Sequence, residues 1–529
     1  MATVAANSYP PILLDAALAL HDGHLHIAEP LLKRYLKDDP FDARAIRMLA
    51  ELAGRIGRNR DAESLLRRAL ELAPAFTAAR ANLALVLYRQ NRAPEALIEL
   101  DELLATEPEH IGHANLKAAA LGRLGGFEEA IALYERVLAA APQQPKVWMS
   151  YGHMLKTLGR QRDGVAAYRR AIDLQPALGE AWWSLANLKT VRFSDADIAA
   201  MTQARQQDGL DIEDAFHLDF ALGKALEDRG EADRAFAHYA AGNAARRAQL
   251  GYDSAAITRM VDALSTMLTP DFFAARAGWG CASPEPIFVL GMPRAGSTLI
   301  EQILSSHSEV EGTTELPDMP AMARCVADYP RGLATLTREQ AHTLGEEYLR
   351  RASVQRRTGR PFFIDKLPNN WLHVPLIRLI LPNARIIDAR RDPLACCFSN
   401  FKQHFARGQG FSYGLEDMGR YYRDYVRLMA RMDAAQPGAV QRVIHEQLVD
   451  APVAGIKALL DALGLSFEPA CLSFHETERA VRTASSEQVR QPIFRGGDKA
   501  WQPFATHLGQ LEAALGDVID LYPSVPSFA

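Results

Sequence analysis

Residues 291–298, GMPRAGST, have the composition of an anion-binding turn. They follow a short apolar segment and precede an apolar helical pattern, so a strand, a glycine-rich turn and a helix N-terminus meet there. Backbone N–H groups and the helix dipole converge at such a junction and attract an anion. The spacing G-x-x-x-x-G matches a nucleotide phosphate loop, but Ser297 stands where its lysine belongs, and Arg294 supplies a cation instead. Because kinases and ATPases rely on that lysine and on Mg²⁺, ATP hydrolysis is disfavoured.

This turn and five later segments, in the same order and spacing, resemble the sulfotransferases, most closely the protein-tyrosine sulfotransferases. The segments are PRAGSTL at 293–299, HSEVEGTTE at 307–315, DKLP at 365–368, RDP at 391–393 with Ser399, HEQLV at 445–449 and SSEQV at 485–489. The resemblance covers residues 284–505. It implies an enzyme that takes its sulfuryl group from 3′-phosphoadenosine-5′-phosphosulfate (PAPS) and leaves adenosine 3′,5′-bisphosphate.

The resemblance implies two phosphate-binding places for this cofactor. The 5′-phosphosulfate contacts the turn, at Arg294, Ala295, Gly296, Ser297 and Thr298. The 3′-phosphate contacts Arg391 and Ser399, and the chain supports this, because Arg391 ends an expected strand and Ser399 follows two helical turns later. Arg390 is the competing candidate for the 3′-phosphate contact. The non-functional alternative is that the arginine and Asp392 form a surface ion pair. Further contacts are implied at His445, Ser485 and Lys499.

The resemblance also implies the catalytic groups. Lys366 follows an apolar strand and emerges at the carboxyl edge of a sheet, where such domains bind ligands. With Arg294, it would stabilise charge on the leaving phosphate, and Ser485 would touch the transferring group. Glu315 matches the catalytic base that takes the acceptor proton. Glu311 is a nearby alternative for the base. Without a catalytic role, Lys366 would be an ordinary solvated lysine, and the glutamate would be a surface carboxylate or the N-cap of a helix starting at Pro317.

Several positions depart from the family pattern. His445 stands where the tyrosyl enzymes carry a tyrosine, Gln403 replaces an arginine one turn beyond Ser399, and Ala295 replaces a serine. The match at Lys499 needs a one-residue shift. These departures affect the identity of the acceptor more than that of the sulfuryl donor. We expect His307 and His404 to be structural.

Short, continuous apolar runs alternate with helical patterns from about residue 284 onward. The runs lie at 286–291, 361–365, 384–390 and 442–449. Continuous rather than alternating apolar strands indicate a parallel sheet that is covered on both faces. We therefore predict a three-layer, P-loop-like α/β domain over residues 284–529.

The first part of the chain repeats every 34 residues. Three columns keep this step: Pro40, Pro74, Pro108, Pro142, Pro176; Gly23, Gly57, Asn91, Gly125, Gly159; and Ala28, Ala62, Ala96, Ala130, Gly164. These columns fit a unit of two helices. Gly or Asn allows the positive φ of the turn between them, the small residue lets the helices pack closely, and proline ends the second helix. The pattern resembles the tetratricopeptide repeat (TPR), and we predict an array of about five such repeats over residues 1–190.

Residues 191–283 are predicted to be a connector with a sixth, looser helix pair marked by Gly230 and Ala235. Within it, the stretch 190–215 receives no assignment beyond a link. Trp148, Trp182 and Trp183 fall where such repeats carry packing aromatics, so we expect them in the core. The array is expected to offer a groove for a peptide or partner protein, with a spacer or dimerisation surface as the alternative.

Composition excludes several classes of protein. The 529 residues are 48% apolar and 23% charged, which is not the balance of a disordered chain, and the net charge of −5 does not suit a nucleic-acid binder. Five cysteines without metal-ligand spacing predict neither a disulfide framework nor a metal site. Without an 18-residue apolar run or a basic leader, the chain is expected to be cytoplasmic, with no membrane span.

The hypothesis from the sequence is a TPR array followed by a PAPS-dependent sulfotransferase. A peptide or protein tyrosine presented by the array is the preferred acceptor. A sugar or small-molecule hydroxyl is the alternative acceptor. The non-enzymatic hypothesis is a TPR scaffold that carries a non-catalytic nucleotide-binding module. The sequence does not specify the oligomeric state.

Overall fold

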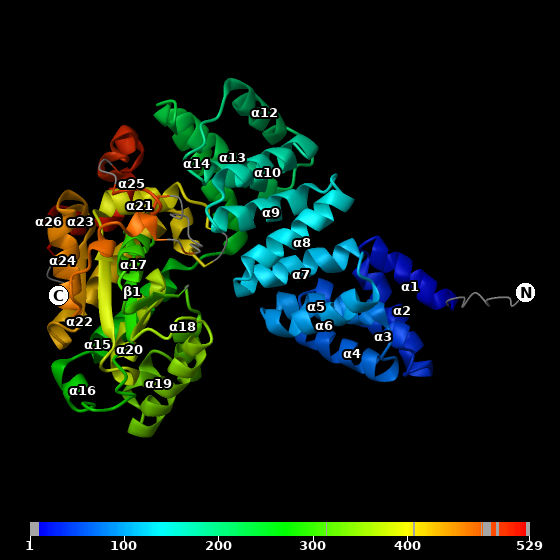
Figure 1. The fold of residues 1–529 in the computed structure, drawn as a ribbon, viewed down its shortest axis with the longest axis horizontal. Helices are drawn as coiled ribbons and strands as arrows, with labels where there is room; N and C mark the ends of the chain where they lie inside the picture. The colour runs from blue at the N-terminus through cyan, green and yellow to red at the C-terminus, as the bar shows by residue number, and fades with distance from the viewer. Residues whose placement is uncertain are drawn as a thin grey trace, which may run out of the picture. The chain divides into compact units, whose positions relative to one another are not determined.

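The computed structural model describes residues 10–313, 315–405, 408–477, 479, 488–493 and 497–524. The chain divides into two compact units, Met1–Leu174 and Gln175–Ala529. Each is described by itself below, and Figure 1 labels their elements. In the described part of the chain, no helix is both long and apolar enough to cross a membrane.

The described residues of the first unit form consecutive pairs of helices. These are α1 (Pro11–His21), α2 (Leu25–Asp38), α3 (Ala43–Arg55), α4 (Asn59–Leu72), α5 (Thr77–Arg89), α6 (Ala93–Thr106), α7 (Ile111–Leu124), α8 (Phe127–Ala140), α9 (Pro145–Thr157) and α10 (Gln161–Leu174). Each helix packs on the one before it and the one after it. The contacts are therefore local in sequence, as in a stacked repeat.

The predicted repeat is confirmed column by column. The turn residues have φ between 63° and 86°: Gly23, Gly57, Asn91, Gly125 and Gly159. The four alanines of the packing column are fully buried: Ala28, Ala62, Ala96 and Ala130. Each proline of the repeat follows the end of the second helix of its pair, as Pro40 follows α2. The periodic residues thus set the turn, the close approach and the helix end.

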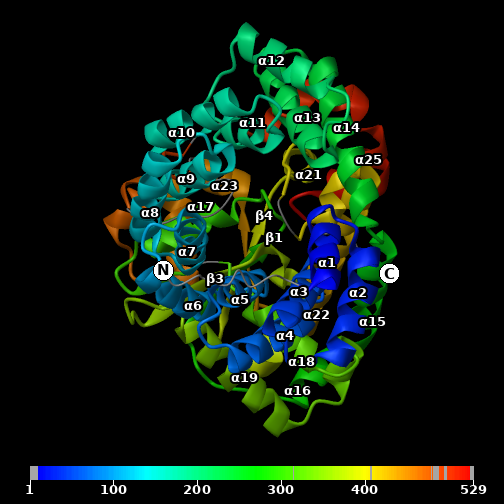
Figure 2. The same cartoon turned by 90° about the vertical axis from the view of Figure 1, so that its right-hand side faces the viewer.

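The second unit opens with further helices. They are α11 (Gly179–Ala186), α12 (Asp195–Arg205), α13 (Ile212–Glu227), α14 (Ala232–Leu250), α15 (Ser254–Met267) and α16 (Pro270–Ala274). Helix α13 packs on α11, α12 and α14, and Figure 2 shows α12, α13 and α14 next to one another. Between α13 and α14, Gly230 has φ 79°, and Ala235 is fully buried. The predicted sixth pair is therefore α13 with α14. We call residues 179–250 the α11–α14 segment.

A parallel sheet forms the centre of the α/β domain. Its described strands are β1 (Pro286–Gly291), β2 (Val310–Gly312), β3 (Phe362–Lys366), β4 (Arg385–Arg390) and β5 (Gln441–Ile444), in the order β2-β3-β1-β4-β5. Every pair in the sheet is parallel, and Val289 of β1 is in register with Lys366 and Ile387. All residues of β1 are buried, and because successive side chains point to opposite faces, both faces are covered. This confirms the three-layer prediction.

The helices around the sheet, visible in Figure 1, complete the domain. They are α17 (Ser297–Ser305), α18 (Asp318–Cys325), α19 (Arg338–Ser353), α20 (Val374–Ile380), α21 (Pro393–Phe401), α22 (Leu415–Ala435), α23 (His445–Asp450), α24 (Pro452–Ala462), α25 (Gly509–Leu515) and α26 (Val518–Leu521). Short 3₁₀ helices lie at η1 (Arg331–Ala334), η2 (Pro368–His373), η3 (Gly410–Tyr413), η4 (Pro469–Cys471), η5 (Phe474–Glu476), η6 (Gly497–Lys499) and η7 (Gln502–His507).

Two details of the sheet differ from the sequence prediction. The run 442–449 is not one strand, because β5 ends at Ile444 and residues from His445 form α23. An apolar run of that length does not separate a short strand from the helix after it. Strand β2, only three residues long, was not predicted. Since β1 lies between β3 and β4, the turn after β1 sits where the strand order reverses, which is where such sheets bind ligands.

Candidate functional site

The turn after β1 is shaped by two glycines. Gly291 has φ 128°, and a Cβ there would lie 2.3 Å from the carbonyl oxygen of Ala389 on the neighbouring strand. Gly296 has φ 98° and directly precedes α17, and a Cβ there would lie 2.7 Å from Nδ1 of His445. Neither position accommodates a larger residue, so the backbone passes close to its neighbours and brings the N-terminus of α17 to the cavity.

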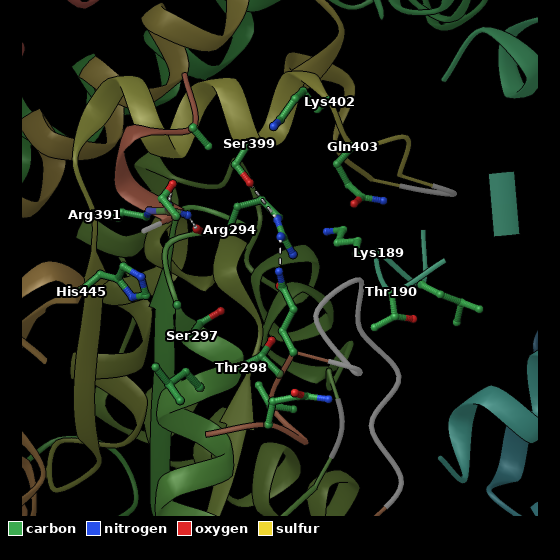
Figure 3. A pocket seen from close by; sticks show the side chains of 18 of the residues that line it. Lys189, Thr190, Arg294, Ser297, Thr298, Arg391, Ser399, Lys402, Gln403 and His445 are labelled. Carbon is green, nitrogen blue, oxygen red and sulfur yellow. Dashed lines mark hydrogen bonds between the residues drawn. The ribbon is translucent and has the colours of Figure 1, made fainter. Parts of the chain in front are cut away.

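A cavity of about 700 Å³ opens above this turn, and Figure 3 shows its polar side chains. Seven residues predicted from the sequence line it together: Arg294, Gly296, Ser297, Thr298, Arg391, Ser399 and His445. They come from the turn after β1, from the end of β4, from α21 and from the start of α23. The structure thus unites the two predicted phosphate-binding places in one cavity.

Arg391 lines this cavity and is 9% exposed. Its guanidinium donates to the carbonyl oxygens of Arg294 at 3.2 Å and Gly497 at 2.8 Å, and pairs with Asp498 at 3.2 Å. Within the described part of the chain, its Nε is buried without a hydrogen-bond partner. A buried donor without an acceptor is costly, so this site suits an added anion.

The competing candidate, Arg390, faces the other way. It is 2% exposed, does not line the cavity, and pairs with the buried Asp388 at 2.9 Å. Its guanidinium also lies over the ring of Tyr425. Arg390 therefore belongs to the core beneath β4, and Arg391 is the arginine of this pair that reaches the cavity.

Arg294 and Ser399 contact each other. Nε of Arg294 donates to Oγ of Ser399 at 3.1 Å, and its Nη2 donates to the side chain of Gln488 at 3.3 Å. Burial lowers the pKa of Arg294 to about 10, and the nearby Arg391 adds to this. Both effects disfavour the charged form, so an anion placed between the two arginines would relieve them.

His445 forms the opposite edge of the turn. Burial, and next the charge of Arg391, lower its pKa to about 4. The imidazole is therefore neutral at pH 7 and offers one donor and one acceptor to a ligand.

The predicted catalytic pair lies together but outside the cavity. Lys366 ends β3, is 2% exposed, and forms an ion pair with Glu315. Its Nζ also lies 3.9 Å from a carboxylate oxygen of the buried Glu301, on α17. The side chain of Glu315 is 48% exposed, so one side of the pair faces solvent. The first residues of α17 thus belong to the turn at the cavity, and Glu301, one helical turn later, lies beside Lys366.

The alternative base, Glu311, is engaged elsewhere. Its carboxylate accepts the backbone N–H groups of Arg357 and, at 2.8 Å, Thr358. Burial alone would raise the pKa of Glu311, but these hydrogen bonds and the nearby Arg356 hold it below its usual value. Glu315 is not the cap of α18 either, since that helix begins after Pro317 without a side-chain cap.

The remaining predicted residues are dispersed. Ala295 is buried and does not line the cavity, and Lys499 is exposed at the end of η6 and does not line it either. Ser485 lies outside the described residues. Gln403 lines the cavity, and its amide donates to the carbonyl oxygen of His404 at 3.0 Å. His307 is fully buried between Ser466 and the N–H of Glu309, so it has the structural contacts expected of it.

One cluster of potential metal ligands lies elsewhere, in the first unit. The ligand atoms of Glu107, His110 and His113 are within 4.8 Å of one another. Nδ1 of His110 accepts the backbone N–H of His113 at 3.2 Å, which makes it the N-cap of α7. The cluster therefore serves the helix start and has no part in the cavity.

Comparison with protein families agrees with this geometry. Residues 286–469 match the model of the sulfotransferase family. This part of the chain is a sulfotransferase-family domain. Residues 55–120 and 115–178 match tetratricopeptide repeat models, so the domain follows a TPR region.

Individual relatives match parts of the chain. An uncharacterized protein of Aquifex aeolicus is 32% identical over 303 residues, which are 55% of this chain and 40% of that protein. A Caenorhabditis briggsae protein, provisionally named a protein-tyrosine sulfotransferase, is 24% identical over 41% of this chain and 80% of its own length. Nodulation protein NoeE of Sinorhizobium fredii is 28% identical over 22% of this chain and 32% of its length.

Solved structures match the helical repeats. MamA of Desulfovibrio magneticus covers 31% of this chain and 93% of its own, at 17% identity and a TM-score of 0.29.

Sequence reasoning missed one wall of the cavity. Residues of the α11–α14 segment face the sulfotransferase domain across it: Trp183, Ala186, Leu188, Lys189, Thr190, Lys224, Glu227 and Tyr239. Trp183 is buried as expected of a packing aromatic, yet it also lines the cavity. The 34-residue period identifies packing positions only, and the sequence offered no signal for Lys189 or Thr190.

Proposed function

We propose that the second unit is a PAPS-dependent sulfotransferase that transfers a sulfuryl group to an acceptor hydroxyl and leaves adenosine 3′,5′-bisphosphate. One observation carries the proposal. A helix N-terminus and the Arg391–Ser399 pair, which are far apart in the sequence, line one cavity, and Nε of Arg391 is buried there without an acceptor in the described residues. The family match of residues 286–469 supports the same class of reaction.

The cavity fits a nucleotide with two anionic ends. The turn, with Arg294, Ser297 and Thr298, would hold the 5′-phosphosulfate on backbone N–H groups and hydroxyls. Arg391 and Ser399 would hold the 3′-phosphate, with Arg391 exchanging its contact to Asp498 for the phosphate. ATP lacks a 3′-phosphate, so this pair would select the bisphosphate.

PAPS supplies the sulfuryl group and a phosphate leaving group, and the chain supplies the charges around them. Glu315 would accept the proton of the acceptor hydroxyl, because its exposed side is open to an incoming molecule. Lys366, held between Glu315 and Glu301, would stabilise negative charge on the departing phosphate, together with Arg294.

The preferred acceptor is a tyrosine in a peptide or protein that the TPR array presents. Repeats of this class offer extended concave surfaces to polypeptides, and the Caenorhabditis briggsae relative carries a protein-tyrosine sulfotransferase name. We further place the protein in the reducing cytoplasm, since all five cysteines, each in a described position, are free.

Calorimetric titration tests the donor. We expect adenosine 3′,5′-bisphosphate to bind the wild type far more tightly than ATP with Mg²⁺, and Arg391→Ala to weaken bisphosphate binding by about 30-fold or more. Arg423→Ala, on the exposed face of α22, is the matched control and keeps wild-type affinity. A wild type that binds ATP and not the bisphosphate would refute the proposal.

A further inference from the structure

Two long cationic side chains occupy strained backbone positions beside the cavity. Among the described residues, four non-glycine residues have φ in the left-handed region: Asn91, Lys189, Arg294 and Asp328. Asn and Asp tolerate this conformation because their short side chains bond locally, whereas Lys and Arg gain nothing from it. Both of the latter, Lys189 at 64° and Arg294 at 67°, line the same cavity.

The strain at Lys189 is not explained by the helix end alone. Lys189 follows α11, and its N–H donates to the carbonyl oxygen of Ala186 at 3.0 Å, as at many helix C-termini. Glycine is the residue that suits this position at least cost. A lysine held there points to a use for its side chain, because strained residues concentrate at binding and catalytic sites.

Lys189 faces the turn across the cavity. In Figure 3 its ammonium end points toward the guanidinium of Arg294, with Gln403 above it and Thr190 below it. Cations from two distant parts of the chain thus approach each other around one space. An anionic ligand placed in this space would be attracted by both positive charges.

The α11–α14 segment is attached firmly to the sulfotransferase domain. Lys402, directly after α21, pairs with Glu227 of α13 at 2.5 Å. Asn243 of α14, 1% exposed, donates to the carbonyl oxygen of Phe401 at 2.9 Å. Because these contacts join the helices on either side of the cavity, the wall that carries Lys189 has a fixed place opposite the turn.

We propose that Lys189, with Thr190, is part of the nucleotide-binding site and holds the anionic groups of the bisphosphate nucleotide from the side opposite Arg391. This rests on the proposed function. Gln403, which follows α21 and lines the cavity, carries no charge, and Lys189 supplies a positive charge beside it. The connector is therefore a component of the cofactor site as well as a link between the repeats and the domain.

Titration of adenosine 3′,5′-bisphosphate into the full-length protein tests this proposal. Lys189→Met, which keeps the length of the side chain and removes the charge, is expected to weaken binding by about 10-fold or more, and Lys189→Arg to retain most of it. The salt dependence of the dissociation constant should also become shallower in Lys189→Met, because one fewer charge meets the ligand. Arg192→Met is the control: this exposed arginine pairs with Asp228 and does not line the cavity.

The outcomes separate this inference from the proposed function. If the wild type does not bind the bisphosphate, the proposed function fails and this inference with it. If the wild type binds and Lys189→Met binds equally well with the same salt dependence, only the inference is overturned. It is equally overturned if Lys189→Met weakens binding no more than Arg192→Met does, or if its sole effect is a higher KM for the acceptor. Thermal unfolding without nucleotide shows whether each variant is folded.

Discussion

At the scale of single residues, Lys366 has an unusual environment. It is a lysine at 2% exposure with two carboxylates around it, of which Glu301 is buried and Glu315 is half exposed. A buried cation needs such partners, because burial without them is very costly. Glu301 is itself shared with Arg479, which lies 3.0 Å away. Glu315 is thus the partner that can turn toward an acceptor while Glu301 stays beside Lys366.

We predict that Glu315→Gln and Lys366→Met each lower the turnover number by about 100-fold or more. Glu315 does not line the cavity, so the dissociation constant of adenosine 3′,5′-bisphosphate should change little in Glu315→Gln, whereas Lys366→Met, which removes a charge near the departing phosphate, should also weaken binding. Radiolabelled sulfate transfer measures the first quantity and calorimetry the second. Glu311→Gln makes the same chemical change on a carboxylate bound to backbone N–H groups, and it should leave turnover intact. Equal losses in Glu311→Gln and Glu315→Gln would contradict the assignment.

At the scale of elements, a histidine pair joins α13 to the end of α21. The rings of His217 and His404 lie 4.7 Å apart, and Trp183, Phe216 and Phe220 pack around them. Burial lowers the pKa of His217 to about 4 and that of His404 to about 3. Both are therefore neutral in the folded protein over a range where an exposed histidine takes up a proton.

This pair predicts acid sensitivity of the second unit. Below about pH 6.5 the unfolded chain binds protons that the folded chain does not, so stability is fully present above that pH and falls as the pH drops toward 4. Each histidine contributes at most about 1.4 kcal/mol per pH unit. Urea unfolding at pH 7 and pH 5, followed by tryptophan fluorescence, measures the loss. Replacing His404 by Asn should reduce it, and an unchanged pH dependence would show that the pair is not responsible.

The elements also show how far sequence reasoning reaches. The turn at 291–298 and the Arg391–Ser399 spacing were predictable because each depends on neighbours within one strand, turn or helix. The end of β5 was misplaced, since His445–Asp450 continues an apolar run and only tertiary packing makes it a helix. Lys189 and Thr190 could not be predicted at all, because their position depends on α11 packing against α13 and on α13 joining α21.

At the scale of the whole molecule, the chain divides into its two units after Leu174, ahead of the residues that line the cavity. Every described residue that lines it lies after Leu174, within the second unit. The first unit is stabilised by its own neighbour-to-neighbour helix contacts. The cavity and the first five helix pairs therefore lie in separate units of the chain.

We predict that a chain of residues 175–529 binds adenosine 3′,5′-bisphosphate with the affinity of the full-length protein. A chain of residues 284–529 should lose most of it, because it lacks Trp183, Lys189 and the helices that hold them. Calorimetry on both, after circular dichroism has established that they are folded, makes the comparison. Full affinity in the shorter chain would show that the α11–α14 segment is dispensable.

The strand order bears on how the protein emerges from the ribosome. The helices of the first unit contact helices that lie one or two positions away in sequence, so they can fold while the rest of the chain is still being made. Strand β1 is different, because both of its partners, β3 and β4, are synthesised long after it. Its apolar residues must wait unpaired, exposed to aggregation, until those strands arrive. We therefore expect the repeats to be folded before the sheet of the second unit is complete.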